Sequence, residues 1–111
     1  MEPYRILFDQ IEWHSPQPGV RFKVRRDGPK QVRLIEFTPE FVEREWCERG
    51  HAGFVLAGEL EIDFSGHVVR FSEGAALLIP AGPHHRHKAR ILTPCVRLFL
   101  VDEVPDQAAT S

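Results

Sequence analysis

The sequence lacks features that define several classes of protein. It has no basic run: 14 Lys and Arg residues stand against 16 Asp and Glu residues, and the formal net charge is -2. Because phosphate binding needs clustered Lys and Arg, we do not expect nucleic acid as a partner. The nearest approach to a basic patch, residues 23–30, is interrupted by Asp27 and Gly28 and is better explained as a solvated turn.

Long apolar runs are also lacking, so no membrane partner is expected. The segment from Met1 to Gln10 has neither the basic start nor the apolar run of a signal peptide, and we therefore expect a cytoplasmic protein. Cysteine is scarce, with only Cys47 and Cys95. In a reducing compartment these two should be free thiols. Two cysteines alone cannot form a structural zinc site, although histidines could complete one.

Internal repeats, low-complexity segments, a nucleophile elbow, a phosphate-binding loop and a CxxC pair are all missing. What is present is an ordinary composition for a globular domain, 42% hydrophobic and 27% charged. A chain of 111 residues can bury one core. We therefore expect a single domain over residues 1–111, with its core at about 18–102 and a frayed tail at 104–111.

Short strands dominate the predicted structure. Nine prolines and eight glycines divide the chain into short pieces, and residues 20–25 and 59–64 alternate between apolar and polar side chains. Asp27-Gly28-Pro29 and Ser65-Gly66 are turn signals. One short helical turn could form from Thr38 to about Arg44. This pattern predicts an all-β sandwich or barrel. Further candidate strands are 31–37, 54–57, 67–71, 76–79, 85–91 and 96–101.

Two motifs resemble those of the cupin family. Residues 54–60 read FVLAGEL, similar to the cupin signature YVLxGEL. The second cupin motif, G-x5-P-x-G-x2-H-x3-N, is matched by Gly74, Pro80, Gly82 and His85, and departs only at Ala89, where Asn is expected. The sequence thus resembles small single-domain cupins of the RmlC-like superfamily. That resemblance implies a double-stranded β-helix, the cupin jelly-roll barrel.

The first cupin motif, G-x5-H-x-H-x3,4-E-x6-G, keeps its spacing but changes its ligand types. Counted back from Gly58, its Glu position falls on His51 and its two His positions fall on Cys47 and Glu45. By position, the resemblance implies a metal bound by Glu45, Cys47, His51 and His85. His87 is a further ligand or a group that orients one.

The chemistry of these residue types agrees with a metal site. Residues two apart on a strand share a face, so Glu45 could align with Cys47, and His85 with His87. Carboxylate, thiolate and imidazole all bind divalent transition metals, and a thiolate favours zinc, iron or copper over magnesium or calcium. Of these we expect zinc or iron. Structural explanations stay open: Cys47 as a small buried residue, Glu45 as a solvated acid and His51 as the end of a turn.

Three functions remain open at this stage. The resemblance implies a metal-dependent enzyme, dioxygenase- or isomerase-like, that acts on a small molecule through open coordination positions. The alternatives are a non-catalytic module that binds a small ligand or senses metal, and a barrel that has lost its metal. The sequence identifies neither the substrate nor a catalytic residue. Exposed strand edges favour pairing between chains. The small cupins that the sequence resembles are generally dimeric, so we expect a homodimer.

Overall fold

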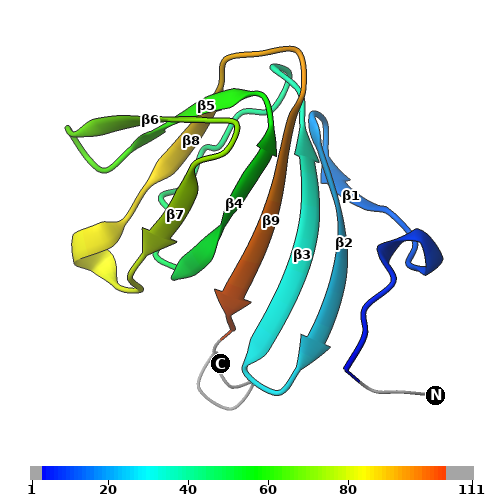
Figure 1. The fold of residues 1–111 in the computed structure, drawn as a ribbon. Helices are drawn as coiled ribbons and strands as arrows, with labels where there is room; N and C mark the ends of the chain where they lie inside the picture. Colours follow the sequence, from blue (N-terminus) through cyan, green and yellow to red (C-terminus); the bar gives the residue numbers. More distant parts are fainter. Residues whose placement is uncertain (1–3, 105–111) are drawn as a thin grey trace.

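The computed structural model describes residues 4–104, which form nine β-strands and two single-turn 3₁₀ helices (Figure 1). The predicted all-β fold is confirmed. No helix in these residues is long and apolar enough to cross a membrane. Apart from Val104, the tail expected to fray lies outside the described residues. The elements are η1 (Phe8–Gln10), β1 (His14–Gln17), β2 (Val20–Asp27), β3 (Lys30–Phe37), β4 (His51–Ala57), β5 (Glu59–Asp63), β6 (Val68–Ser72), β7 (Ala76–Ile79), η2 (Pro83–His85), β8 (Lys88–Ile91) and β9 (Val96–Glu103).

Two antiparallel sheets form the walls of the jelly roll. The larger has the order β1-β2-β3-β9-β4-β7, and the smaller has the order β6-β5-β8. The turn glycines match the sequence signals, because Gly28 joins β2 to β3 with a φ of 61° and Gly66 joins β5 to β6 with a φ of 105°. Figure 1 shows the small sheet facing one end of the large one.

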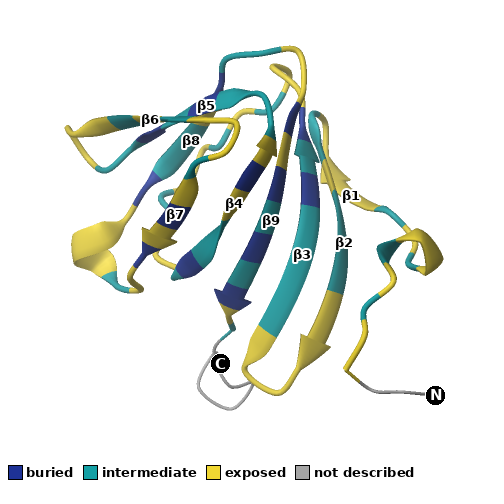
Figure 2. Ribbon diagram, viewed as in Figure 1, coloured by how far each residue is buried: buried dark blue, intermediate teal, exposed yellow. Residues whose placement is uncertain are grey.

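The core lies between the sheets because each strand alternates its side chains between two faces. In β9 the buried positions are Val96, Leu98, Leu100 and Asp102, and the residues between them are more exposed (Figure 2). Burial of each large aliphatic side chain contributes about 1.5–3 kcal/mol. The buried hydrophobic residues are Ile35, Phe37, Val55, Leu60, Ile62, Leu77, Ile79, Ile91, Val96, Leu98 and Leu100.

Two local expectations differ from the structure. The segment after Thr38 forms one turn, closed by a hydrogen bond from the Phe41 N–H to the Thr38 carbonyl (3.0 Å), and it does not continue as a helix. The strand expected over 85–91 begins only at Lys88. Pro83 fixes its own φ and favours the helical turn η2, which holds His85 before the strand begins.

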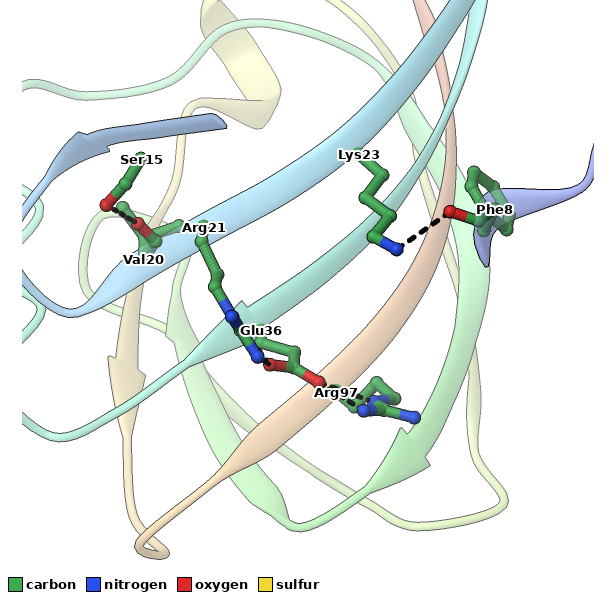
Figure 3. A network of polar contacts seen from close by, with 7 residues as sticks. All are labelled: Phe8, Ser15, Val20, Arg21, Lys23, Glu36 and Arg97. Atoms are coloured by element: carbon green, nitrogen blue, oxygen red, sulfur yellow. Dashed lines mark hydrogen bonds and ion pairs between the residues drawn. The ribbon is translucent and has the colours of Figure 1, made fainter. Parts of the chain in front are cut away.

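The outer face of the large sheet is covered unevenly. The ring centroids of Phe8 and Phe99 lie 6.3 Å apart, and the Arg21 guanidinium lies 4.0 Å from the centroid of Trp13. Lys23 Nζ donates to the Phe8 carbonyl (2.7 Å; Figure 3). The N-terminal segment therefore packs over the outer face of β2 and β9.

Over β4 and β7, by contrast, apolar side chains are exposed. Leu78 is 82% exposed, and Phe54 and Leu56 are also exposed. Leu78 pairs with Ala52 across the two strands, so it points to the same outer face as Phe54.

Candidate metal centre

A row of polar side chains crosses the inner face of the large sheet at one end. The strand register places Gln31 opposite Asp102, and Asp102 opposite His51. In the neighbouring row Arg33 lies opposite Leu100, which is followed by Gly53 and Leu77. A polar cluster is therefore built at one end of an interior that is otherwise mostly apolar.

Asp102 is the centre of this cluster. Its side chain is 0% exposed, and its Oδ1 accepts a hydrogen bond from His51 Nδ1 (2.5 Å). Its Oδ2 accepts from Arg33 Nε (2.5 Å) and from Gln31 Nε2 (2.9 Å). Burial opposes ionisation of Asp102, but the hydrogen bonds from His51 and Arg33 outweigh it and hold the pKa of this carboxyl well below its usual range. The ionised carboxylate keeps a proton of His51 on Nδ1, so Nε2 is the nitrogen that faces Cys47 and is the one placed to bind a metal.

Cys47 and His87, which face His51, belong to segments that are not part of the large sheet. They form an antiparallel backbone bridge in which each N–H donates to the other's carbonyl (2.9 Å each). His87 Nδ1 lies 2.9 Å from the His85 carbonyl oxygen and donates to it. Both histidines of the cluster therefore have Nδ1 engaged and Nε2 available.

The three free donor atoms converge. Cys47 Sγ lies 3.6 Å from His51 Nε2, and the ligand atoms of Cys47, His51 and His87 all lie within 4.8 Å of one another. The two imidazole rings meet edge to face with their centroids 5.1 Å apart. A thiolate and two imidazoles at this separation match the donor types of a zinc or iron site.

The electrostatics favour a thiolate in the metal-free protein. Burial disfavours the thiolate, but hydrogen bonds from His51, His87 and the Arg49 backbone N–H outweigh it and lower the pKa of Cys47 to about 5. Burial likewise opposes protonation of His51, and the contacts with Asp102 and Cys47 reverse this, so that its pKa is raised. Burial also opposes protonation of His87, whose pKa is nevertheless raised by Cys47 and by the His85 carbonyl.

The cluster opens into a cavity of about 330 Å³ between the two sheets. Its walls are largely apolar, and its polar groups are few. Glu43 faces it with Oε1 accepting a hydrogen bond from the Ala89 N–H (2.7 Å). Burial raises the pKa of Glu43. The other polar lining residues are Gln17, Arg33, Cys47, Arg49, His51 and His87.

Of the residues proposed from the sequence, the structure brings Cys47, His51 and His87 together, and it leaves Glu45 and His85 outside the group. Glu45 is exposed because residues 41–50 form no strand beyond the bridge at Cys47, so the alternation assumed for them does not apply. His85 is exposed in η2 and contributes its backbone carbonyl to His87.

Sequence reasoning missed Asp102, Arg33 and Glu43. Asp102 did carry a signal, since it is the one charged residue at an inward position of the alternation Val96, Leu98, Leu100. Arg33 carried a similar signal, since it is a charged residue two positions from the buried Ile35 on β3 and therefore shares its inward face. Nothing in the sequence distinguished Glu43 from its neighbouring acids.

Comparison with known proteins identified relatives of the fold. The cupin domain family matches residues 40–101. KdgF from Halomonas sp. has a TM-score of 0.73 and 23% identity, with 93% of this chain and 96% of that one covered. An RmlC-like cupin from Shewanella frigidimarina NCIMB 400 has a TM-score of 0.75 and 12% identity, covering 98% and 97%. The polyketide cyclase RemF from Streptomyces resistomycificus has a TM-score of 0.72 and 17% identity, covering 96% and 82%. No curated protein matched.

Proposed function

Because this chain belongs to the cupin family, we propose that it is a zinc-dependent enzyme that acts on a small molecule, with Cys47, His51 and His87 as the metal ligands. The observation that carries this proposal is the separation of 3.6 Å between Cys47 Sγ and His51 Nε2. With bonds of about 2.3 Å to sulfur and about 2.0 Å to nitrogen, tetrahedral zinc requires a separation of about 3.5 Å, and a right-angled octahedral edge requires about 3.0 Å. The separation between Cys47 Sγ and His51 Nε2 is therefore closer to the edge of a tetrahedral zinc site than to a right-angled octahedral edge.

The groups behind the ligands support the same proposal. Imidazoles that bind a metal usually donate their other N–H to a carboxylate or a carbonyl, which fixes the tautomer and the ring. His51 has Asp102 in this role, and His87 has the His85 carbonyl. Three protein ligands leave one position of a tetrahedral site open, as in catalytic zinc sites.

The reaction class follows from the donor set and the cavity. Bound zinc supplies a Lewis acid that polarises a carbonyl oxygen, and it has no redox chemistry of its own. Glu43 faces the same cavity, and its raised pKa allows it to hold a proton on the oxygen that Ala89 does not bind. We therefore favour isomerase-like proton transfer over dioxygenase chemistry.

Metal analysis with matched variants tests this proposal. The protein is purified without added metal or a metal-binding tag, and its metals are quantified by elemental mass spectrometry. We expect about one zinc per chain, lost in Cys47→Ala/His87→Ala and kept in the control Cys95→Ala/His85→Ala, which removes the same side-chain types outside the cluster. Stoichiometric iron would redirect the proposal to oxygen chemistry. No metal after refilling with zinc and iron would leave a barrel that has lost its metal.

A second candidate function uses the same cysteine without metal. Cys47, His51 and Asp102 stand in the order of a nucleophile, a base and an orienting carboxylate, with contacts of 3.6 Å and 2.5 Å. His87 distinguishes the two candidates. As a ligand it is required for zinc retention, whereas the nucleophile needs only His51 and Asp102 beside Cys47. Zinc would protect Cys47 of the wild-type protein from iodoacetamide until it is chelated, so rapid alkylation of the wild-type protein as purified and after chelation alike would favour the metal-free nucleophile.

We also propose that two copies of the chain pair through the exposed face of β4 and β7. Strand β7 is an edge of the large sheet, and Leu78, Phe54 and Leu56 make the adjoining outer face apolar. The N-terminal segment covers the other half of this face and leaves the half over β4 and β7 open to a partner. A second copy of the same chain is the partner that is always present. Light scattering at micromolar concentration should give a dimer, and Leu78→Lys should give a monomer. A monomeric wild-type protein would contradict the pairing.

A further inference from the structure

Arg33 has hydrogen-bonding capacity that the protein does not use. It points inward from β3 and lines the cavity, and its side chain is 15% exposed. Nε donates to Asp102, but Nη1 and Nη2 make no hydrogen bond to any residue in the range 4–104. Every fully buried side-chain nitrogen in that range has a partner, so these two nitrogens reach accessible space. Because Arg33 lines the cavity, the four N–H donors on Nη1 and Nη2 are available to a ligand there.

The guanidinium is held in place from two directions. Asp102 fixes the Nε edge, and the guanidinium carbon lies 5.3 Å from the ring centroid of Phe22. A planar group fixed in this way loses little freedom when it binds a ligand. The free edge with Nη1 and Nη2 is a fork that matches the two oxygens of a carboxylate.

The rest of the cavity limits what the ligand can be. A volume of about 330 Å³ is at the lower end of the range for ligand sites. The walls beside the polar cluster are formed by aliphatic side chains, which require an apolar ligand body. Because Asp102 already offsets the charge of Arg33, a monoanion suits the subsite better than a doubly charged phosphate. The aliphatic lining residues include Leu60, Ile62, Leu77, Ile79, Leu98 and Leu100.

We infer that the substrate class is a small monocarboxylic acid with an apolar body, and that Arg33 binds its carboxylate. This inference rests on the proposed function, because it concerns the same cavity. Asp102 binds His51 through one oxygen and Arg33 through the other, so the carboxylate subsite adjoins the candidate metal centre. Arg33 would hold one end of the acid while the remainder faces Cys47, His51 and His87.

Fluorine NMR titration tests the inference with two probes of the same shape, 4-fluorobenzoate and 4-fluorobenzamide. On the zinc-loaded wild-type protein, we expect the acid to bind at least about tenfold more tightly than the amide, because only the acid forms charge-assisted hydrogen bonds with the fork. This comparison requires no variant. Equal affinity for acid and amide would overturn the inference.

Variants identify the group responsible. Arg33→Lys keeps the charge beside Asp102 but removes the fork, and we expect it to weaken binding of the acid about tenfold and leave the amide unchanged. The control Arg97→Lys alters an outer-face arginine that is also paired with a carboxylate, and should change neither. An acid preference that survives Arg33→Lys would mean that the metal binds the carboxylate, and would contradict the role of Arg33.

The same titration on zinc-depleted protein separates this inference from the zinc proposal. If the wild-type protein never retains zinc but still prefers the acid in an Arg33-dependent way, the zinc site fails and the carboxylate subsite stands. If zinc is retained and the preference is absent, the subsite fails and the zinc site stands.

Discussion

Two carboxylates of the large sheet, Glu36 on its outer face and Asp102 on its inner face, each pair with two basic side chains. Glu36 pairs with Arg21 (2.7 Å) and with Arg97 (Figure 3). Asp102 pairs with Arg33 and His51 at 2.5 Å each. Their surroundings differ: Arg21 and Arg97 are 49% and 47% exposed, whereas Arg33 and His51 are 15% and 9% exposed.

The difference shows that a buried ion pair can fix the orientation of a neighbouring side chain, here the imidazole of His51. Burial opposes ionisation of Glu36, and its two arginines outweigh that effect and lower its pKa, so both carboxylates are ionised. The outer network remains in contact with water and salt, which weaken it. In the inner network every fully buried side-chain nitrogen and oxygen has a hydrogen-bond partner, and His51 Nε2 faces Cys47.

The largest expected effect is on stability when the inner carboxylate is removed. Asp102→Ala should lower the free energy of unfolding by about 3–5 kcal/mol, because it leaves Arg33 buried without its partner. Urea denaturation followed by circular dichroism measures this loss. A loss below about 1 kcal/mol would mean that burial does not distinguish Asp102 from Glu36.

The next largest effect should be on metal affinity, which should depend on the inner network and not on the outer one. Asp102→Asn keeps the shape but weakens the orientation of His51, and we expect zinc to bind about 10–100-fold less tightly. Competition with a chromophoric chelator measures the affinity. Glu36→Gln is the matched control and should leave it unchanged, because Glu36 faces the opposite side of the sheet. An equal loss in both variants would remove the special role of Asp102.

The pH dependence of the metal-free protein sharpens the comparison. The Cys47 thiol has its pKa lowered from 9.0 to about 5, so its thiolate contributes stability that is fully present above the unfolded value and is lost as the pH falls through about 5. His51 has its pKa raised, so its contribution is present below the unfolded value and is lost as the pH rises through the folded value.

Thiolate absorbance in the ultraviolet measures the first of these titrations. We expect a midpoint near pH 5 that disappears in Cys47→Ser and persists in Cys95→Ser. Asp102→Asn should move the midpoint upwards, because it destabilises the protonated form of His51, which faces the thiolate. An unshifted midpoint would show that Asp102 does not influence the ionisation of Cys47.

The smallest expected effect belongs to the outer network. Glu36→Gln should cost at most about 1 kcal/mol of unfolding free energy, and the cost should fall as salt is added, since its arginines are half exposed. Urea denaturation at low and high salt measures both values. A larger, salt-independent loss would show that Glu36 behaves as a buried group.

The sequence predicted the fold well because local patterns determine it. Alternation in β2 and β5 and the turn glycines at Gly28 and Gly66 each specify a strand or a hairpin without reference to the rest of the chain. The site was predicted only in part. Spacing found Cys47 and His51, because the motif retains its length there.

The remaining features of the site depend on contacts that sequence spacing does not contain. Asp102 and His51 lie 51 positions apart and meet only through the pairing of β9 with β4. His87 faces the cluster because η2 ends before it and the bridge to Cys47 fixes its backbone. Glu45 and His85 occupy ligand positions of the cupin motifs, but no strand or bridge turns them towards the cluster, and their side chains are exposed.

X-ray absorption at the zinc edge tests the central claim most directly, since it reports the atoms bound to the metal. On protein purified with its own zinc, we expect one sulfur at about 2.3 Å and two imidazole nitrogens at about 2.0 Å. The sulfur contribution should be absent from zinc-refilled Cys47→Ala and present in Cys95→Ala. A wild-type spectrum with only nitrogen and oxygen neighbours would contradict the assignment of Cys47, His51 and His87 as the metal centre.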